Sequence, residues 1–267
     1  MPGTTPSRVT QRREQHIDRR AAARLLLIEG AAFGAYLVIL MLIFPPGTGM
    51  NVAVLIAPFL IWTQLATTLR DEYGYQPRGR EQRLRSTVVI IVLLMVCGAL
   101  LTVFLDIDLP SWARPLPGVL SFVLYAVLAW DEYRRASVEA IRRGRTPFTR
   151  AVRVQTIGIG VVLGVIIASA ASPALIAAIA TAAVMIALAA WLLTTALTGG
   201  STAATAWGVF HWICFAAAGA VVAVLLLLMQ YSTLPLTAVG YVLGALIAIA
   251  FVVGALVVGA LREAEDV

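Results

Sequence analysis

The chain lacks lysine altogether and has only two histidines, two cysteines and few charged residues of any kind. Because every basic residue is arginine, neither a Gly-Lys-Ser/Thr phosphate-binding loop nor a lysine Schiff base is available. The two histidines, His16 and His211, and the distant cysteines, Cys97 and Cys214, do not have the spacing of a zinc site or a disulfide framework. We therefore expect no metal site and no cofactor.

Charge is scarce and hydrophobic residues are abundant. Only 13% of the 267 residues are charged and 60% are hydrophobic, whereas a soluble domain is roughly one quarter charged. The arginines that raise the isoelectric point to about 9.9 flank apolar runs and do not form a soluble basic face. This composition predicts an integral membrane protein that contacts the lipid bilayer and binds no nucleic acid.

Apolar runs of roughly 17 to 25 residues, the length that crosses a bilayer, recur along the chain. The eight candidate spans are Ala22 to Phe44, Val52 to Leu69, Thr87 to Leu105, Leu116 to Trp130, Val154 to Ala171, Ala174 to Leu197, Ala206 to Gln230, and Leu236 to Leu261. The fourth reaches span length only if it begins earlier or continues past Trp130. The fifth and sixth are separated by little more than Ser172 and Pro173.

The arginines are distributed unequally between the two sides of these spans. If the spans alternate in direction, nineteen of the twenty arginines fall on one side and Arg114 alone falls on the other. Because positive charge marks the cytoplasmic side, we expect both termini in the cytoplasm and an even number of spans in the cell membrane. The predicted parts are a basic N-terminal segment (1–21), a transmembrane domain (22–261) with basic cytoplasmic loops near 70–86 and 131–153, and a short C-terminus (262–267).

Prolines occupy each of the four presumed outer turns. They are Pro45 and Pro46, then Pro110, Pro115 and Pro117, then Pro173, and finally Pro235. Proline has no N–H to continue a helix, so it favours a turn at these points. The sequence therefore predicts an all-α polytopic transmembrane bundle of about eight spans arranged as four hairpins.

The first two hairpins end in the same three residues, Asp-Glu-Tyr, at 71–73 and at 131–133. A duplicated hairpin gives such a match, but acidic and aromatic residues also commonly mark the membrane interface. Asp131 of the second match stands four residues before Arg135, and the two side chains can pair on one helical face. The arginines that follow, Arg134, Arg135, Arg142 and Arg143, are candidate contacts for anionic lipid head groups or a partner, or they serve topology alone.

Small residues repeat at intervals of four in the fifth and eighth spans. Gly160 and Gly164 lie in the fifth span, and Gly240 and Gly244 lie in the eighth. This spacing lets two helix backbones approach closely. We expect these two spans to pack tightly within the bundle or across a contact with a second copy or a partner subunit.

Glu29 and His211 are the ionisable residues that fall inside the predicted spans. An ionisable group in lipid is a functional candidate because its desolvation is costly. Both residues lie within a few turns of the cytoplasmic end of their spans, so they form a candidate intramembrane polar pair that could relay protons. The alternative is that Glu29 reaches the interface and that His211 belongs to an aromatic cluster with Trp207 and Trp212.

Two classes of function remain open. The first is a transporter or a permease-type membrane component, which the multiple spans and the hairpin match favour. The second is an accessory or regulatory membrane protein that acts through its basic cytoplasmic loops. Few polar residues line the spans, and a polar substrate would need such a lining. No set of nucleophile, base and acid occurs, so the sequence does not indicate an enzyme.

Overall fold

A computed structural model describes residues 19–43, 53–72, 80–105, 107, 109–135, 148–198 and 203–265. Within these ranges the regular secondary structure is all α-helix, and short turns and non-helical segments join the helices. The helices are α2 (Arg19–Ile43), α3 (Ala53–Glu72), α4 (Arg80–Phe104), α5 (Leu116–Arg134), α6 (Arg150–Ala170), α7 (Ala174–Thr198), α8 (Ala203–Ala206), α9 (Val209–Tyr231) and α10 (Thr237–Glu265). The all-α prediction is confirmed for the described residues.

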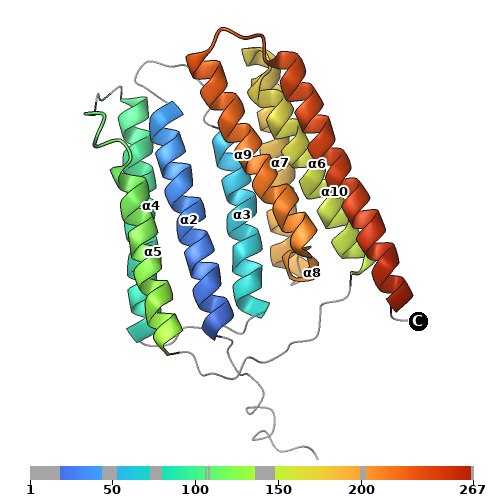
Figure 1. Ribbon diagram of the computed structural model, residues 1–267, viewed down its shortest axis with the longest axis horizontal. Helices are drawn as coiled ribbons and strands as arrows, with labels where there is room; N and C mark the ends of the chain where they lie inside the picture. The colour runs from blue at the N-terminus through green and yellow to red at the C-terminus, as the bar shows by residue number, and fades with distance from the viewer. Residues whose placement is uncertain are drawn as a thin grey trace, which may run out of the picture.

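The long helices run alternately up and down through one bundle (Figure 1). The turn between α9 and α10 lies at the end of the bundle opposite the last residues of α5 and the first residues of α6. Arg19 at the start of α2 and Glu265 at the end of α10 lie at the same end. We call this end the arginine-rich end, because it carries the arginines of α5 and of the beginning of α6.

Five of the described helices are long and apolar enough to cross a membrane. Their spans are Arg19–Leu42, Gln82–Ala99, Arg150–Ala170, Val209–Met229 and Thr237–Val257. The helices α3 and α5 are outside this group, and the apolar part of α7 is the shorter Leu175–Trp191. Large apolar side chains face outward along the bundle, such as Leu94 at 65% exposure and Ile186 at 71%. This surface suits hydrocarbon, whereas the count of eight spans stays a prediction.

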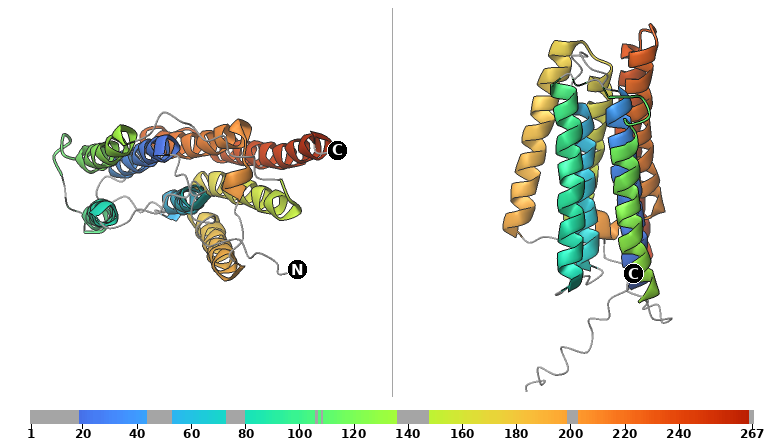
Figure 2. Two further views of the ribbon diagram at one scale, coloured as in Figure 1. Left: turned by 90° about the horizontal axis from the view of Figure 1, so that it is seen from below. Right: turned by 90° about the vertical axis from the view of Figure 1, so that its left-hand side faces the viewer.

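The helices lie in two rows (Figure 2). Seen along the bundle, α5, α2, α9 and α10 form one row, and α4, α3 and α6 lie on its other side, with α7 beyond them. The closest packing joins α2 to α5 and α6 to α10, although neither pair is consecutive in the chain. α3 contacts α2 on one side and α6, α7 and α8 on the other, so it connects the part of the bundle that contains α2 and α5 with the part that contains α6 and α10. The four-hairpin arrangement therefore does not describe the tightest contacts.

Local sequence explains several helix ends. Thr149 caps α6, because its hydroxyl oxygen accepts a hydrogen bond from the Val152 amide at 3.3 Å. Pro115 precedes the first turn of α5, where the missing N–H of proline costs nothing. α6 ends at Ala170 and α7 begins at Ala174, so the tight turn expected around Ser172 is confirmed.

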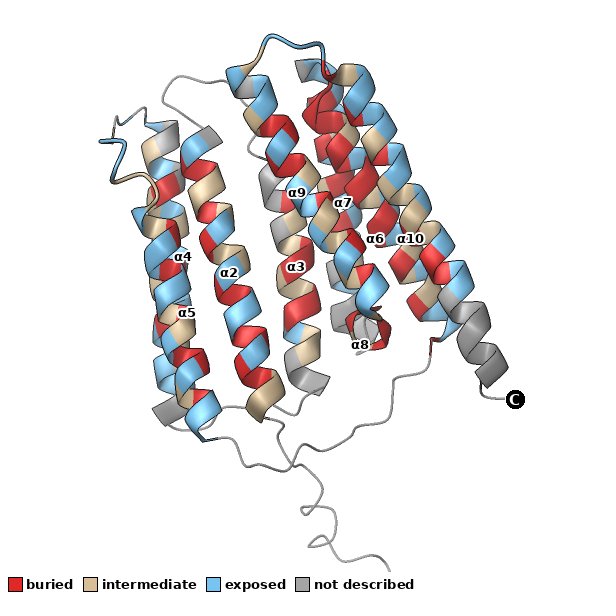
Figure 3. Ribbon diagram, viewed as in Figure 1, coloured by how far each residue is buried: buried red, intermediate tan, exposed pale blue. Residues whose placement is uncertain are grey.

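The observed helices are longer than two of the predicted spans. α4 begins at Arg80 and runs without a break into the apolar run expected from Thr87. α5 continues past Trp130 to Arg134, which is the extension that the short fourth span required. Exposed residues occur along the length of the helices that face the viewer in Figure 3, so helix faces contribute much of the surface of the described residues.

Candidate functional site

An apolar cleft of about 540 Å³ lies between α2, α3 and α9. Its lining residues are Ile28, Ala31, Ala32, Ala35, Tyr36 and Ile39 from α2, Pro58 and Trp62 from α3, and Phe215, Ala216, Gly219, Ala220, Val222 and Ala223 from α9. We call it the α2–α9 cleft. Its volume is within the range of about 300–1,000 Å³ that ligand pockets occupy. The lining comes from the central turns of the three helices, away from the ends.

Small side chains make up both rims of the cleft and leave it open to the side. Ala31 and Ala35 on α2 are exposed, as are Ala216, Gly219 and Ala220 on α9. A Cβ atom added at Gly219 would have no heavy atom within 4 Å. The two helices in the same row therefore do not close against each other here, and α3 behind them supplies Pro58 and Trp62.

The cleft contains a buried hydrogen-bond donor, the indole N–H of Trp62. Trp62 is only 8% exposed and stacks with Phe215 at 6.1 Å between ring centroids. Its indole nitrogen has no hydrogen-bond acceptor among the described residues. The buried Trp207 provides a contrast, because its indole N–H donates to the Thr156 hydroxyl at 2.9 Å. A buried donor without an acceptor loses its hydrogen bonds to water and gains none in the protein, which costs free energy.

The two ends of the cleft differ. At the end opposite the arginines, the Tyr231 hydroxyl donates to the carbonyl of Leu42 at 3.2 Å and joins the last turn of α9 to that of α2. At the other end, Arg24 lies four residues before Ile28, so both side chains lie on one face of α2. Arg24 is exposed, and the ion pairs found among the described residues do not involve it. The two helices are therefore joined by a hydrogen bond beyond one end of the cleft and carry an exposed arginine beyond the other.

His211 is fully buried and enclosed by aromatic rings. Its ring centroid lies 5.8 Å from that of Phe148, 5.7 Å from those of Trp207 and Phe210, and 6.4 Å from that of Phe251. These rings come from α9, α10 and the segments that precede α6 and α9. The aromatic cluster expected around His211 is present, and it includes Trp207.

Glu29 is also fully buried, in a different part of the bundle. It shares a face of α2 with Leu26 and Phe33, which lie three residues before it and four after it. Leu26 packs in a cluster with residues of α4 and α5, and Phe33 stacks on Tyr125 at 5.4 Å. These neighbours give no support to the Glu29–His211 pair predicted from the sequence, which stays a prediction.

The glycines singled out in the sequence lie along the contact between α6 and α10. A Cβ atom at Gly164 would lie 2.6 Å from the carbonyl oxygen of Gly244. One at Gly240 would lie 2.5 Å from the Cβ of Ala171, and one at Gly160 would overlap Phe251. The backbones approach closely because hydrogen atoms occupy these positions. Whether a second copy uses the same glycines stays open.

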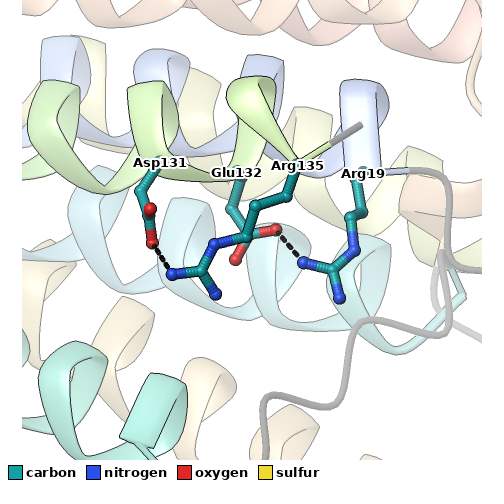
Figure 4. Close-up of polar contacts among 4 residues, drawn as sticks. All are labelled: Arg19, Asp131, Glu132 and Arg135. Atoms are coloured by element: carbon teal, nitrogen blue, oxygen red, sulfur yellow. Dashed lines mark hydrogen bonds and ion pairs between the residues drawn. The ribbon is translucent and has the colours of Figure 1, made fainter. Parts of the chain in front are cut away.

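One ion pair joins α2 to α5 at the arginine-rich end, and a second lies within the last turn of α5 (Figure 4). A guanidinium nitrogen of Arg19 lies 3.4 Å from a carboxylate oxygen of Glu132, which is 3% exposed. The predicted pair of Asp131 and Arg135 is confirmed, at 2.7 Å. The Arg134 guanidinium lies 5.0 Å from the centre of the Trp130 ring.

These contacts bear on the arginines expected to bind lipid head groups. Arg134 and Arg135 are exposed, but each already contacts a neighbour on its own helix. Arg142 and Arg143 lie outside the described residues. Head-group or partner contact by the four arginines therefore stays a prediction.

No cluster of histidine, cysteine, aspartate and glutamate that could hold a metal ion occurs within the described ranges. Cys97 and Cys214 are both free thiols. The arrangement offers a binding cleft and buried ionisable groups, without an assembled catalytic set in the described residues.

No family model matches the chain, and neither a curated protein nor a solved structure was found to be similar to it.

Sequence reasoning missed two features. Gly30 and Gly34 in α2 have the same four-residue spacing as the glycines of α6, and a Cβ atom at Gly34 would lie 2.8 Å from the carbonyl oxygen of Gly118 in α5. The spacing alone could have identified this contact. The α2–α9 cleft had a weaker signal, the small residues that recur at mid-helix on α2 and α9, and no periodicity links those two helices.

Proposed function

We propose that the protein is a transport component that moves an amphipathic, phospholipid-like molecule through the cell membrane. The observation that carries this proposal is the apolar α2–α9 cleft, which is open to the side along two helices. A polar substrate would need polar groups along its path. An amphipathic substrate needs an apolar groove for its chain, and only its head group needs water or charge.

The packing of the bundle is compatible with movement around the cleft. The α2–α5 and α6–α10 pairs are held by direct backbone approach at Gly34 and Gly118 and at Gly164 and Gly244. Helix pairs that are packed in this way move as units, whereas the rims of the cleft meet through few contacts. Opening and closing of α2 against α9 would then give a substrate access to the cleft. We further propose eight spans, with both termini in the cytoplasm.

The test is a lipid translocation assay on the full-length protein. It is reconstituted in phosphatidylcholine vesicles that contain a trace of NBD-labelled phosphatidylcholine, and dithionite is added to destroy the dye in the outer leaflet. Protein-containing vesicles should lose more fluorescence than empty vesicles, because dye from the inner leaflet becomes accessible. Gly219→Leu should reduce this extra loss by placing a side chain in the cleft, and Gly158→Leu is the matched control.

The control is matched because a Cβ atom at Gly158, in α6, also meets nothing within 4 Å. Equal fluorescence loss from empty and protein-containing vesicles, measured with correctly folded protein, would contradict the proposed transport. A loss that Gly219→Leu leaves unchanged would show that the cleft is not the route.

An accessory or regulatory role is the second candidate. The observation that favours it is the exposure of Arg134 and Arg135 at the last turn of α5. This role predicts that an Arg134→Gln/Arg135→Gln variant fails to replace the wild-type protein in cells but moves labelled lipid in vesicles as well as the wild type does. Transport as the main role predicts that Gly219→Leu impairs the function of the protein in cells more than the Arg134→Gln/Arg135→Gln variant does.

A further inference from the structure

The α2–α9 cleft has the features of a site for one phospholipid chain. It is apolar over the central turns of three helices, and it is open along the small residues Ala35 and Gly219. These turns belong to α2 and α9, both of which are long and apolar enough to cross a membrane. At that depth a bilayer offers hydrocarbon and not water. A chain that leaves the bilayer sideways would replace one apolar environment with another at little cost.

The ends of the cleft specify the direction of this chain. The hydrogen bond from Tyr231 to the Leu42 carbonyl joins α9 to α2 beyond the end of the cleft that is farther from the arginines. Arg24 lies beyond the other end of the cleft, one helical turn before Ile28, and no ion pair among the described residues engages it. A guanidinium is the side chain that best matches a phosphate group, because it donates two parallel hydrogen bonds. A phosphate head group would therefore lie at Arg24 with its chain pointing toward Tyr231.

The Trp62 indole supplies a third contact. It is buried, it lines the cleft, and its N–H has no acceptor among the described residues. The ester carbonyl of a phospholipid lies between the phosphate and the chain, and it accepts hydrogen bonds. A bound lipid thus offers an acceptor to a donor that has none among the described residues. Trp62 stacks on Phe215, the lining residue of α9 nearest the arginine-rich end, so this donor lies toward that end of the cleft.

We propose that the α2–α9 cleft binds an anionic phospholipid of the cytoplasmic leaflet, with the phosphate at Arg24, an ester carbonyl at the Trp62 indole and one acyl chain along Ala35 and Gly219. This inference rests on the proposed function, since it names the substrate class of the same cleft. The cytoplasmic leaflet is the source because the arginine-rich end is the cytoplasmic end by the distribution of charge, and that leaflet carries the anionic lipids.

The test is photocrosslinking of the full-length protein in phosphatidylcholine vesicles. One set contains a trace of phosphatidylglycerol with a diazirine in the middle of its acyl chain, and the other contains phosphatidylcholine with the same chain. After irradiation, crosslinked peptides are mapped by mass spectrometry. The wild-type protein should concentrate crosslinks on residues 31–39 and 216–223, with phosphatidylglycerol preferred by about fivefold, the effect expected of one interfacial arginine.

Three variants separate the parts of the site. Gly219→Leu should remove the crosslinks in the cleft for both lipids, whereas Gly158→Leu should leave them unchanged. Arg24→Gln should abolish the preference for phosphatidylglycerol and retain the crosslinks of the chain. If Gly219→Leu does not fold, Ala35→Phe blocks the cleft from the exposed rim of α2 and should have the same effect.

Crosslinks spread evenly over the outward faces of all helices, with the same pattern in the wild type and in Gly219→Leu, would overturn the proposal, because the protein would then contact only surrounding lipid. A phosphatidylglycerol preference that survives Arg24→Gln would overturn the head-group position. The assay measures binding without translocation. If the protein crosslinks as expected but does not move the NBD lipid between leaflets, lipid binding is supported and transport is contradicted. If it moves the NBD lipid but shows no crosslinks in the cleft, transport is supported and the proposed binding site is contradicted.

Discussion

Gly164 of α6 and Gly244 of α10 face each other so closely that a Cβ atom on Gly164 would lie 2.6 Å from the carbonyl oxygen of Gly244. The four-residue spacing of small residues in each of these helices predicts such a close approach from the sequence alone. A contact of this kind depends on the absence of a side chain on both helices. It fixes the distance between the backbones of α6 and α10, and it makes a simple prediction.

Gly164→Leu and Gly244→Leu should each destabilise the protein. The new side chain has to push the α6 and α10 backbones apart, and overpacking of this kind costs about 1–3 kcal/mol or more. Thermal unfolding in detergent measures the effect. Gly158→Leu is the control on the same helix, because a Cβ atom there meets nothing within 4 Å. Equal melting temperatures for the three variants would refute the close contact.

Thr156→Val should lower the free energy of unfolding by about 1–3 kcal/mol, the cost of leaving a buried donor without its acceptor. The Thr156 hydroxyl accepts from the Trp207 indole at 2.9 Å and donates to the Val152 carbonyl at 2.8 Å. Thr156→Ser keeps a hydroxyl and should stay near the wild type. A valine variant as stable as the serine variant would show that the hydrogen bond contributes little.

Glu132→Gln should destabilise the contact between α2 and α5 by about 1–3 kcal/mol, because the charge-assisted bond to Arg19 is weakened at a buried carboxylate. The Glu132 side chain is 5% exposed. Asp131→Asn is the neighbouring comparison. The side chains of Asp131 and Arg135 are 39% and 43% exposed, so loss of this ion pair should lower the free energy of unfolding by less than about 0.5 kcal/mol. Unfolding of both variants in detergent measures the two effects. A larger effect of Asp131→Asn than of Glu132→Gln would contradict the greater contribution that we expect from the buried pair.

Glu29→Gln and His211→Asn should have additive effects on stability, within about 0.5 kcal/mol, as is usual for side chains that pack against different helices and do not contact each other. Glu29 faces the α4 and α5 side of α2, whereas His211 lies among aromatic rings near α10. A double-mutant cycle on thermal unfolding measures the coupling. A coupling well above that limit would support the pair predicted from the sequence, and with it the hypothesis of a proton relay.

Reporter fusions test the orientation that the arginines predict. Fusions after Arg12, Arg80, Arg143 and Arg262 should all report the cytoplasm. Fusions near Gly49 and Arg114 should report the opposite side, because these positions follow an odd number of predicted spans. A terminus on the outer side would rule out an even number of spans.

The candidate sites could be predicted from the sequence to different degrees. The spacing of Gly164 and Gly244 follows from local periodicity, so it could be read directly. The pair of Asp131 and Arg135 is local too, since helical residues four apart always share a face. The neighbours of Glu29 could not be predicted in this way. They depend on which helix α2 packs against, and that helix is α5, more than seventy residues further along the chain.

The sequence by itself determined that the chain is helical and apolar, that its arginines gather at one end, and that small residues allow close approach at particular turns. These properties arise from the composition and spacing of each segment taken alone. The tertiary structure decided that α2 pairs with α5 and α6 with α10, and that α2, α3 and α9 leave a cleft. Hydropathy does not distinguish these partners, because any apolar face is equally satisfied by lipid. Only the fit between surfaces from distant segments selects the partner.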